Sequence, residues 1–348
     1  MNKFRFQRRA AVVATFAFAL LSTHLASADD RLLGMVEPIV AKKTYRIAYA
    51  SADMNSDLFI AKAYGVLDEA KRSNVDVVRV VSAGGYGRVA EQIAQLEQLG
   101  TLGLDAIIVM GSAYNGYDRV VERLSAQGIK VITAGSLISA PKVSFGVIQD
   151  EPKLGGLLAD YICKRKPKAT VITLPGPPGA EWNKKRFDGF QETAAKCGLN
   201  LVGNTFGGKI TIDDGQRQAG DMLLKYPDAD YIYSVAGILS VGAAQQAKRM
   251  HSKAKVVTGT VTRRTIELIE DGSIAVVVSE APIVFGRDSV QYAIRLLEGL
   301  PMPKMVNGIE SFPVTVVPNT PITAETLKHY NLTDYDLPPE GWMPPMLQ

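Results

Sequence analysis

The chain has 348 residues and a formal net charge of +4, from 39 basic and 35 acidic side chains. Four of the basic residues and no acidic residue lie in the first 28 positions, so the remaining 320 residues are formally neutral. Neutrality gives no support for binding to nucleic acid or to anionic lipid. The length favours two domains over one.

The N-terminus has the pattern of a secretion signal. Basic residues between Lys3 and Arg9 precede an apolar run over 10–21, and Ala26-Ser27-Ala28 supplies small residues for signal peptidase. We expect cleavage after Ala28 and export to the periplasm. The alternative is a retained membrane anchor, which this run is too short to form, since about 20 residues span a bilayer.

From residue 45 onward, short apolar runs alternate with amphipathic stretches. The first array predicts strands over 45–50, 75–82, 106–110 and 131–134, and helices over 57–73, 88–99 and 117–126. The second predicts strands over 169–174, 199–205, 231–235, 256–259 and 275–279, and helices over 153–163, 184–196, 214–225, 241–250, 262–271 and 286–297. This alternation is typical of parallel βαβ units.

Two such arrays predict an α/β protein with two doubly wound parallel-sheet lobes. Ligands of such sheets bind outside the carboxyl ends of the strands, so a ligand cleft between the lobes is expected, with closure as the conformational event. After residue 318 the chain contains Trp342 and is rich in proline. The prolines rule out a long helix or central strand. This tail either packs over the lobes or forms an arm that contacts a partner.

Two glycine-rich motifs resemble nucleotide-binding loops. Residues 203–210 nearly match a phosphate-binding loop, but Ile210 stands where a serine or threonine must coordinate Mg²⁺. Residues 85–90 fit G-x-G-x-x-A between a strand and a helix, but after the second strand rather than the first. We interpret them as turns, the second of which lets Tyr86 project toward the cleft.

The sequence offers no catalytic or metal-binding set. After the signal segment only His251 and His329 remain, without a G-x-S-x-G elbow or a neighbouring ligand residue. We therefore predict neither an enzyme nor a cofactor or metal site. Cys163 and Cys197 each end a predicted helix that flanks the strand over 169–174. Right-handed crossovers bring both helix ends to one edge, so we predict a structural disulfide.

The second array resembles the ribose-type (type 1) periplasmic binding proteins. The similarity lies in the segment 173–178, in Gly189-Phe190, in Asp150 followed by Gly155-Gly156, and in Glu280-Ala281-Pro282, and it covers residues 45–317. It implies a signal segment over 1–28, a first lobe over 29–147 plus 284–308, a second lobe over 148–283 plus 309–330, and a tail over 331–348.

Within that superfamily the chain is most similar to the TorT group, periplasmic sensors of trimethylamine N-oxide that act through a membrane kinase. The shared segments are 41–47, 83–86, 174–177 and 339–342. The sugar binders' Asp-Arg pair is replaced by Gly135-Ser136, whereas Glu280 keeps an acid where the TorT group has one. The resemblance therefore implies a small polar ligand of amine-oxide or ammonium type.

The candidate ligand contacts follow strand ends and crossovers. Aromatic side chains attract cationic groups, and a helix N-terminus attracts anionic or dipolar ones. The candidates are Phe59, Tyr86, Ser112, Tyr114, Asp150, Trp182, Lys184 and Glu280. For Asp150 the alternative is a helix cap, and for Glu280 a salt bridge at the crossover.

The predicted function is capture of a small solute and presentation of the occupied protein to an inner-membrane partner. The partner is either a TorT-type sensor histidine kinase or the permease of an ABC importer for a sugar or other solute. An exported enzyme and a relative of transcriptional repressors are the alternatives from other classes. The first lacks a catalytic set, and the second lacks a helix-turn-helix and would not be exported.

Overall fold

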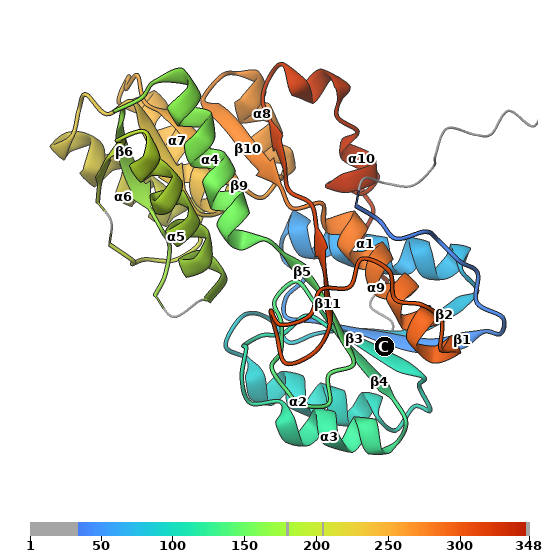
Figure 1. The fold of residues 1–348 in the computed structure, drawn as a ribbon. Helices are drawn as coiled ribbons and strands as arrows, with labels where there is room; N and C mark the ends of the chain where they lie inside the picture. The colour runs from blue at the N-terminus through green and yellow to red at the C-terminus, as the bar shows by residue number, and fades with distance from the viewer. Residues whose placement is uncertain (1–33, 179–180, 204, 346–348) are drawn as a thin grey trace, which may run out of the picture. The chain divides into compact units, whose positions relative to one another are not determined.

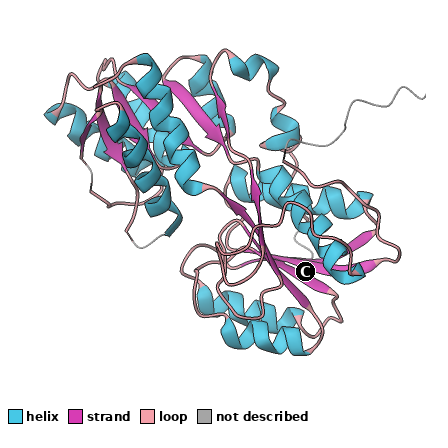
Figure 2. Cartoon of the chain, in the orientation of Figure 1, coloured by secondary structure: helices cyan, strands magenta, loops and turns pink. Residues whose placement is uncertain are grey.

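The structure is a computed structural model that describes residues 34–178, 181–203 and 205–345. Within these residues the chain forms two six-stranded sheets flanked by helices (Figures 1 and 2). The predicted signal segment and its cleavage site after Ala28 lie outside the described residues. In the described part, no helix combines the length and the apolar character needed to cross a bilayer.

The first sheet has the strand order β11-β5-β4-β3-β1-β2, and its strand pairs are all parallel. Its strands are β1 (Tyr45–Ser51), β2 (Val75–Ser82), β3 (Ala106–Val109), β4 (Lys130–Ala134), β5 (Phe145–Gln149) and β11 (Val314–Val317). Helices α1 (Asp57–Arg72) and α9 (Pro282–Glu298) pack together, and α2 (Val89–Leu99) contacts α3 (Asp118–Ala126). Alternate residues of β3 belong to two different hydrophobic clusters, because successive side chains point to opposite faces of a sheet.

The second sheet has the order β12-β10-β9-β8-β6-β7, parallel except for the edge strand β12. Its strands are β6 (Thr170–Leu174), β7 (Asn200–Val202), β8 (Tyr231–Ser234), β9 (Lys255–Gly259), β10 (Ile274–Ser279) and β12 (Thr320–Ile322). Helices α4 (Glu151–Arg165) and α5 (Glu181–Lys196) pack together, as do α6 (Ile212–Lys225), α7 (Gly237–Arg249) and α8 (Arg263–Glu270). Both sheets thus have the predicted doubly wound α/β architecture.

The chain passes from one sheet to the other three times: between β5 and α4, between β10 and α9, and between β11 and β12. The expected lobe limits need one correction, because they placed 309–330 wholly with the second lobe. Strand β11 pairs with β5 of the first sheet, and only β12, which pairs with β10, belongs to the second. Pro321 is tolerated because β12 is an edge strand. The other limits stay a prediction.

The tail returns to the body of the protein through a short 3₁₀ helix, η1 (Thr326–His329), and helix α10 (Leu332–Tyr335). The ring of Trp342 meets Tyr64 of α1 edge-on, with the ring centroids 5.1 Å apart. Asp336 is fully buried and accepts hydrogen bonds from Ser279 at 2.8 Å and from Tyr330 at 2.6 Å. The tail is therefore packed against both α1 and β10.

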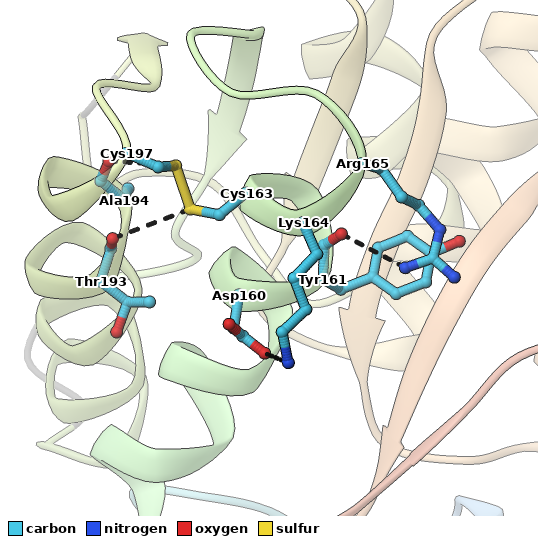
Figure 3. The surroundings of a disulfide bond; sticks show 8 residues. All are labelled: Asp160, Tyr161, Cys163, Lys164, Arg165, Thr193, Ala194 and Cys197. Carbon is cyan, nitrogen blue, oxygen red and sulfur yellow. Dashed lines mark hydrogen bonds and ion pairs between the residues drawn. A yellow bond between two sulfur atoms is a disulfide. The ribbon is translucent and has the colours of Figure 1, made fainter.

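Cys163 near the end of α4 and Cys197 just after α5 form a disulfide in the structure (Figure 3). Their Cα atoms lie 5.7 Å apart. The bond ties together two helices that already pack along one another. The pairing agrees with the prediction from the right-handed crossovers.

Candidate functional site

Each sheet reverses its winding direction at one place, between β1 and β3 in the first sheet and between β6 and β8 in the second. In open α/β sheets the crevice at the carboxyl ends of the strands beside such a switch point is where ligands bind. The loops that follow these strands therefore define the candidate ligand site, and most of the sequence candidates lie in or next to them.

The first-sheet half of the site contains an aromatic pair. Phe59, in the first turn of α1, is buried against Ala52 and Met110, which follow β1 and β3. Its ring lies 6.1 Å from that of Tyr86, at an interplanar angle of 59°. Tyr86 is 50% exposed, and its hydroxyl shares a hydrogen bond of 2.9 Å with Ser136, just after β4. The predicted projection of Tyr86 from the glycine turn thus gives it an exposed aromatic face.

A buried lysine, which sequence reasoning missed, lies beside this pair. Lys62 is only 3% exposed and follows Phe59 by one helical turn. Its ammonium nitrogen lies over the ring of Phe285, 4.7 Å from the centroid. A side chain at Gly135 would displace this group, since its Cβ would come within 2.5 Å of Lys62 Nζ. Burial lowers the pKa of Lys62, against the attraction of Glu280 and Glu151.

Two first-lobe candidates have partners within their own lobe. The Ser112 hydroxyl is buried and hydrogen-bonded to Tyr117 at 2.9 Å, and its amide donates to Gln92 at 2.8 Å. Tyr114 is half-buried, and its hydroxyl donates to Glu310 at 2.7 Å. These hydrogen bonds connect the loop after β3 to Gln92, Tyr117 and Glu310.

The second-sheet half is organised by Arg186, a residue that sequence reasoning also missed. Its guanidinium is 2% exposed and donates to Glu151 at 2.7 Å, to Glu280 at 3.0 Å and to the carbonyl oxygen of Val235 at 2.8 Å. The arginine thus joins the starts of α4 and α5 to the ends of β8 and β10. A planar fork of donors is well suited to such multiple acceptors.

Glu280, which the sequence placed as a ligand contact, is one of these acceptors. Besides Arg186, its Oε1 accepts a hydrogen bond of 2.6 Å from Thr260. Burial alone would raise the pKa of Glu280, but the charges of Arg186 and Lys62 and the two hydrogen bonds together lower it. For Glu151 the balance is opposite: burial dominates and raises its pKa. Glu280 is thus an ionised carboxylate already engaged by an arginine, as in the alternative interpretation of a crossover salt bridge.

The backbone near this cluster has two non-glycine residues in the left-handed region. Thr260 has φ +70°, and Ala281, directly after Glu280, has φ +46°. Such a conformation is uncommon for a β-branched residue and indicates a functional or structural constraint. For Thr260 the constraint is visible, since its hydroxyl binds Glu280.

The remaining second-lobe candidates differ in exposure. Asp150 caps α4, because its carboxylate accepts a 2.9 Å hydrogen bond from the amide of Lys153. Lys184 is exposed and pairs with Asp188 one turn along α5, at 2.6 Å. Trp182 is half-buried, and its ring lies 5.1 Å from the guanidinium carbon of Arg186. Of the three, Trp182 is the one directly connected to the central cluster.

Lys62 and Arg186 carry a signal that a sequence can show. Lys62 lies on the buried face of α1 between Phe59 and Val66, and Arg186 directly precedes Phe187 on the buried face of α5. A charged residue within an apolar helical stripe is uncommon unless it is paired or functional. The spacing alone would have marked both.

The glycine motif at 85–90 contains a turn in the structure, whereas the described residues of 203–210 are irregular with bends. In the segment 203–210, the carboxylate of Asp214 accepts from the amide of Lys209 at 2.6 Å and would lie 1.9 Å from a Cβ at Gly208. The amide of Lys209 thus binds an acid of the protein itself. In the other motif, Gly85 and Gly87 have φ angles of +137° and +83°, which glycine adopts at little cost. In the part of the chain that the structure describes, no three histidine, cysteine or acidic residues group as metal ligands would.

Residues 47–301 match the family described as "Periplasmic binding protein domain". Among curated proteins, the Escherichia coli K12 periplasmic protein TorT is 25% identical over 265 residues, 75% of each chain. The ribose import binding protein RbsB of Bacillus subtilis is 23% identical over 268 residues, which cover 77% of this chain and 86% of RbsB.

A solved structure gives a higher identity. A sugar ABC transport system substrate-binding protein from Bordetella parapertussis 12822 is 38% identical, with a TM-score of 0.84 over 89% of this chain and 98% of that one. A solute-binding protein from Bradyrhizobium sp. BTAi1 has 22% identity and a TM-score of 0.79 over 89% of this chain and 92% of that chain, which supports the fold alone.

Proposed function

Since the chain belongs to the periplasmic binding protein family, whose members bind solutes and are not enzymes, we propose that it is the solute receptor of an ABC importer. In this proposal it is exported and cleaved after Ala28, binds a small polar solute between its two lobes and presents it to an inner-membrane permease. The 38% identity to a substrate-binding protein of a sugar ABC transport system supports this partner.

The observation that carries the proposal is the pairing of an exposed aromatic face with a buried polar cluster at the strand ends. Tyr86 and Phe59 offer an apolar and aromatic surface, and Trp182 offers another beside Arg186. Binding sites of small molecules are mostly apolar with a few placed polar groups. We propose that these three aromatic residues contact the solute, whereas Ser112 and Asp150 support the loops.

A second candidate function is ligand sensing for a membrane histidine kinase, as proposed from the similarity to the TorT group. It is supported by the 25% identity to TorT and by the packing of Trp342 in the similar tail segment. In this case the ligand is of amine-oxide type. Because Glu280 is already paired with Arg186, a simple ammonium ligand would lack a free acid there.

Reconstitution separates the two functions. The mature protein, loaded from a panel of sugars, sugar acids, betaines and amine oxides, is added to proteoliposomes with the permease and ATPase encoded beside its gene. We expect solute-dependent stimulation of ATP hydrolysis. Stimulated autophosphorylation of a neighbouring kinase, with no effect on any permease, would favour sensing. Chemical turnover of a bound solute would contradict both.

A further inference from the structure

Lys62 is a buried residue whose ammonium group has no hydrogen-bond acceptor among the described residues. Within this described part of the chain it forms no hydrogen bond or ion pair, and its nitrogen lies 4.7 Å from the centroid of the Phe285 ring. The residue is only 3% exposed. An ammonium group has three donors, and keeping it on a largely buried side chain without a protein acceptor is costly. Such a group is retained where a ligand supplies the missing acceptor or where it has an electrostatic task.

The nearby acids do not supply that acceptor. Glu280 and Glu151 both bind the guanidinium of Arg186, at 3.0 and 2.6 Å, and neither is within ion-pair distance of Lys62. Lys62 balances their charge through space. The two cations, Lys62 and Arg186, therefore neutralise the two buried acids. The donors of Arg186 are used by protein atoms, whereas those of Lys62 are not.

The ammonium group is placed where the candidate site begins. It lies against Gly135, the residue that follows β4, where the absence of a side chain makes room for it. The next residue, Ser136, holds the hydroxyl of the exposed Tyr86. The donors of Lys62 thus lie at the same edge of the first sheet as the aromatic pair, in the half of the site that this sheet forms.

We infer that Lys62 binds an anionic or oxide oxygen of the solute, and that the ligand class is a small solute in which such an oxygen is joined to a compact body held by Phe59 and Tyr86. This inference rests on the proposed function and adds the chemical class of the ligand. A polar, weakly hydrated body fits aromatic faces, and a charged acceptor gives the stronger hydrogen bond. Neutral sugars and simple ammonium ions lack this oxygen.

Three matched pairs of probes test the inference on the mature protein. In each pair the first probe, called the oxygen-bearing probe below, has an oxide or carboxylate oxygen that the second lacks. The pairs are trimethylamine N-oxide against tetramethylammonium, glycine betaine against choline, and D-galacturonate against D-galactose. Thermal unfolding and titration calorimetry are measured for the wild type, for Lys62→Met, and for Lys71→Met as a control at an exposed position of the same helix.

We expect at least one oxygen-bearing probe to bind the wild type about 10-fold or more tightly than its partner. Lys62→Met should lose about 10- to 100-fold in affinity for that probe and little for its partner, whereas Lys71→Met should bind like the wild type. The preference of the wild type within each pair tests the inference even if Lys62→Met does not fold.

Equal or tighter binding of D-galactose, choline or tetramethylammonium than of their partners would overturn the inference and leave the proposed function standing. The same holds if Lys62→Met binds the preferred probe as tightly as the wild type, since Lys62 would then only balance buried charge. A wild type that none of the three oxygen-bearing probes stabilises also overturns it. The proposed function has its own test, because permease stimulation is measured independently of these probes.

Discussion

Replacing Arg186 by methionine tests whether the buried cluster holds the crossovers together. The substitution keeps the length of the apolar stem but removes the donors to Glu151, Glu280 and Val235. Breaking a buried ion pair from one side costs about 3–5 kcal/mol, because a charge is left buried without its partner. We expect a loss of this size in the free energy of unfolding near neutral pH.

The loss should depend on pH in a direction that follows from the remaining charges. Without Arg186, Lys62 can balance one of the two acids, and the other is stable in the folded state only when protonated. Its pKa then lies above the value of about 4.3 for an unfolded glutamate. The folded variant therefore binds one proton more than the unfolded chain, so its stability falls by up to about 1.4 kcal/mol per pH unit above that value. Below that pH, this proton-linked part of the loss disappears.

Urea unfolding of wild type and Arg186→Met at pH 5 and pH 8 measures both effects. The matched control is Arg217→Met, which removes an exposed arginine from its pair with Asp214 and should cost much less, with little dependence on pH. A loss in Arg186→Met that is equal at the two pH values, or larger at pH 5, would refute the charge argument. A loss below about 1 kcal/mol at pH 8 would refute the buried-pair argument.

Three further outcomes are expected. Burial raises the pKa of Asp336 to about 7, so the wild type should lose up to about 4 kcal/mol relative to Asp336→Asn between pH 4 and pH 8, and parallel pH profiles would contradict this. Replacing Cys163 and Cys197 by serine should cost about 3–4 kcal/mol for a 34-residue separation, and two free thiols in the denatured, non-reduced protein would show that no disulfide forms. Trp342→Ala should cost about 1–2 kcal/mol by removing the contact with Tyr64, and an unchanged melting temperature would mean that the tail does not pack there.

Local periodicity was sufficient to predict the alternating elements, since the long helices and most of the strands carry their own apolar pattern. It missed the strands that depend on distant partners. Strand β5 follows β4 after an irregular loop. Its partner β11, which pairs with it in parallel, begins 165 residues after β5 ends. The short edge strand β12 contains a proline, so its composition indicates an irregular segment instead.

The candidate site was predicted in part for the same reason. Phe59 and Tyr86 could be placed near strand ends because loops after strands can be located from the alternation, and the structure brings their rings together. The engagement of Glu280 could not be predicted, because its partner Arg186 is 94 residues away and on another element. A carboxylate in a sequence carries no sign of which cation will approach it in the fold.

Two strand-end glycines explain how the site acquires its polarity. A Cβ at Gly259, the last residue of β9, would lie 2.8 Å from Arg186 Nη1, as a Cβ at Gly135 would lie 2.5 Å from Lys62 Nζ. In each lobe, therefore, a missing side chain admits a buried cation from a neighbouring helix. The arginine meets two acids and fixes the crossovers, whereas the lysine meets none within bonding distance. Because buried cations require acceptors, this difference assigns the structural task to Arg186 and leaves Lys62 to the solute.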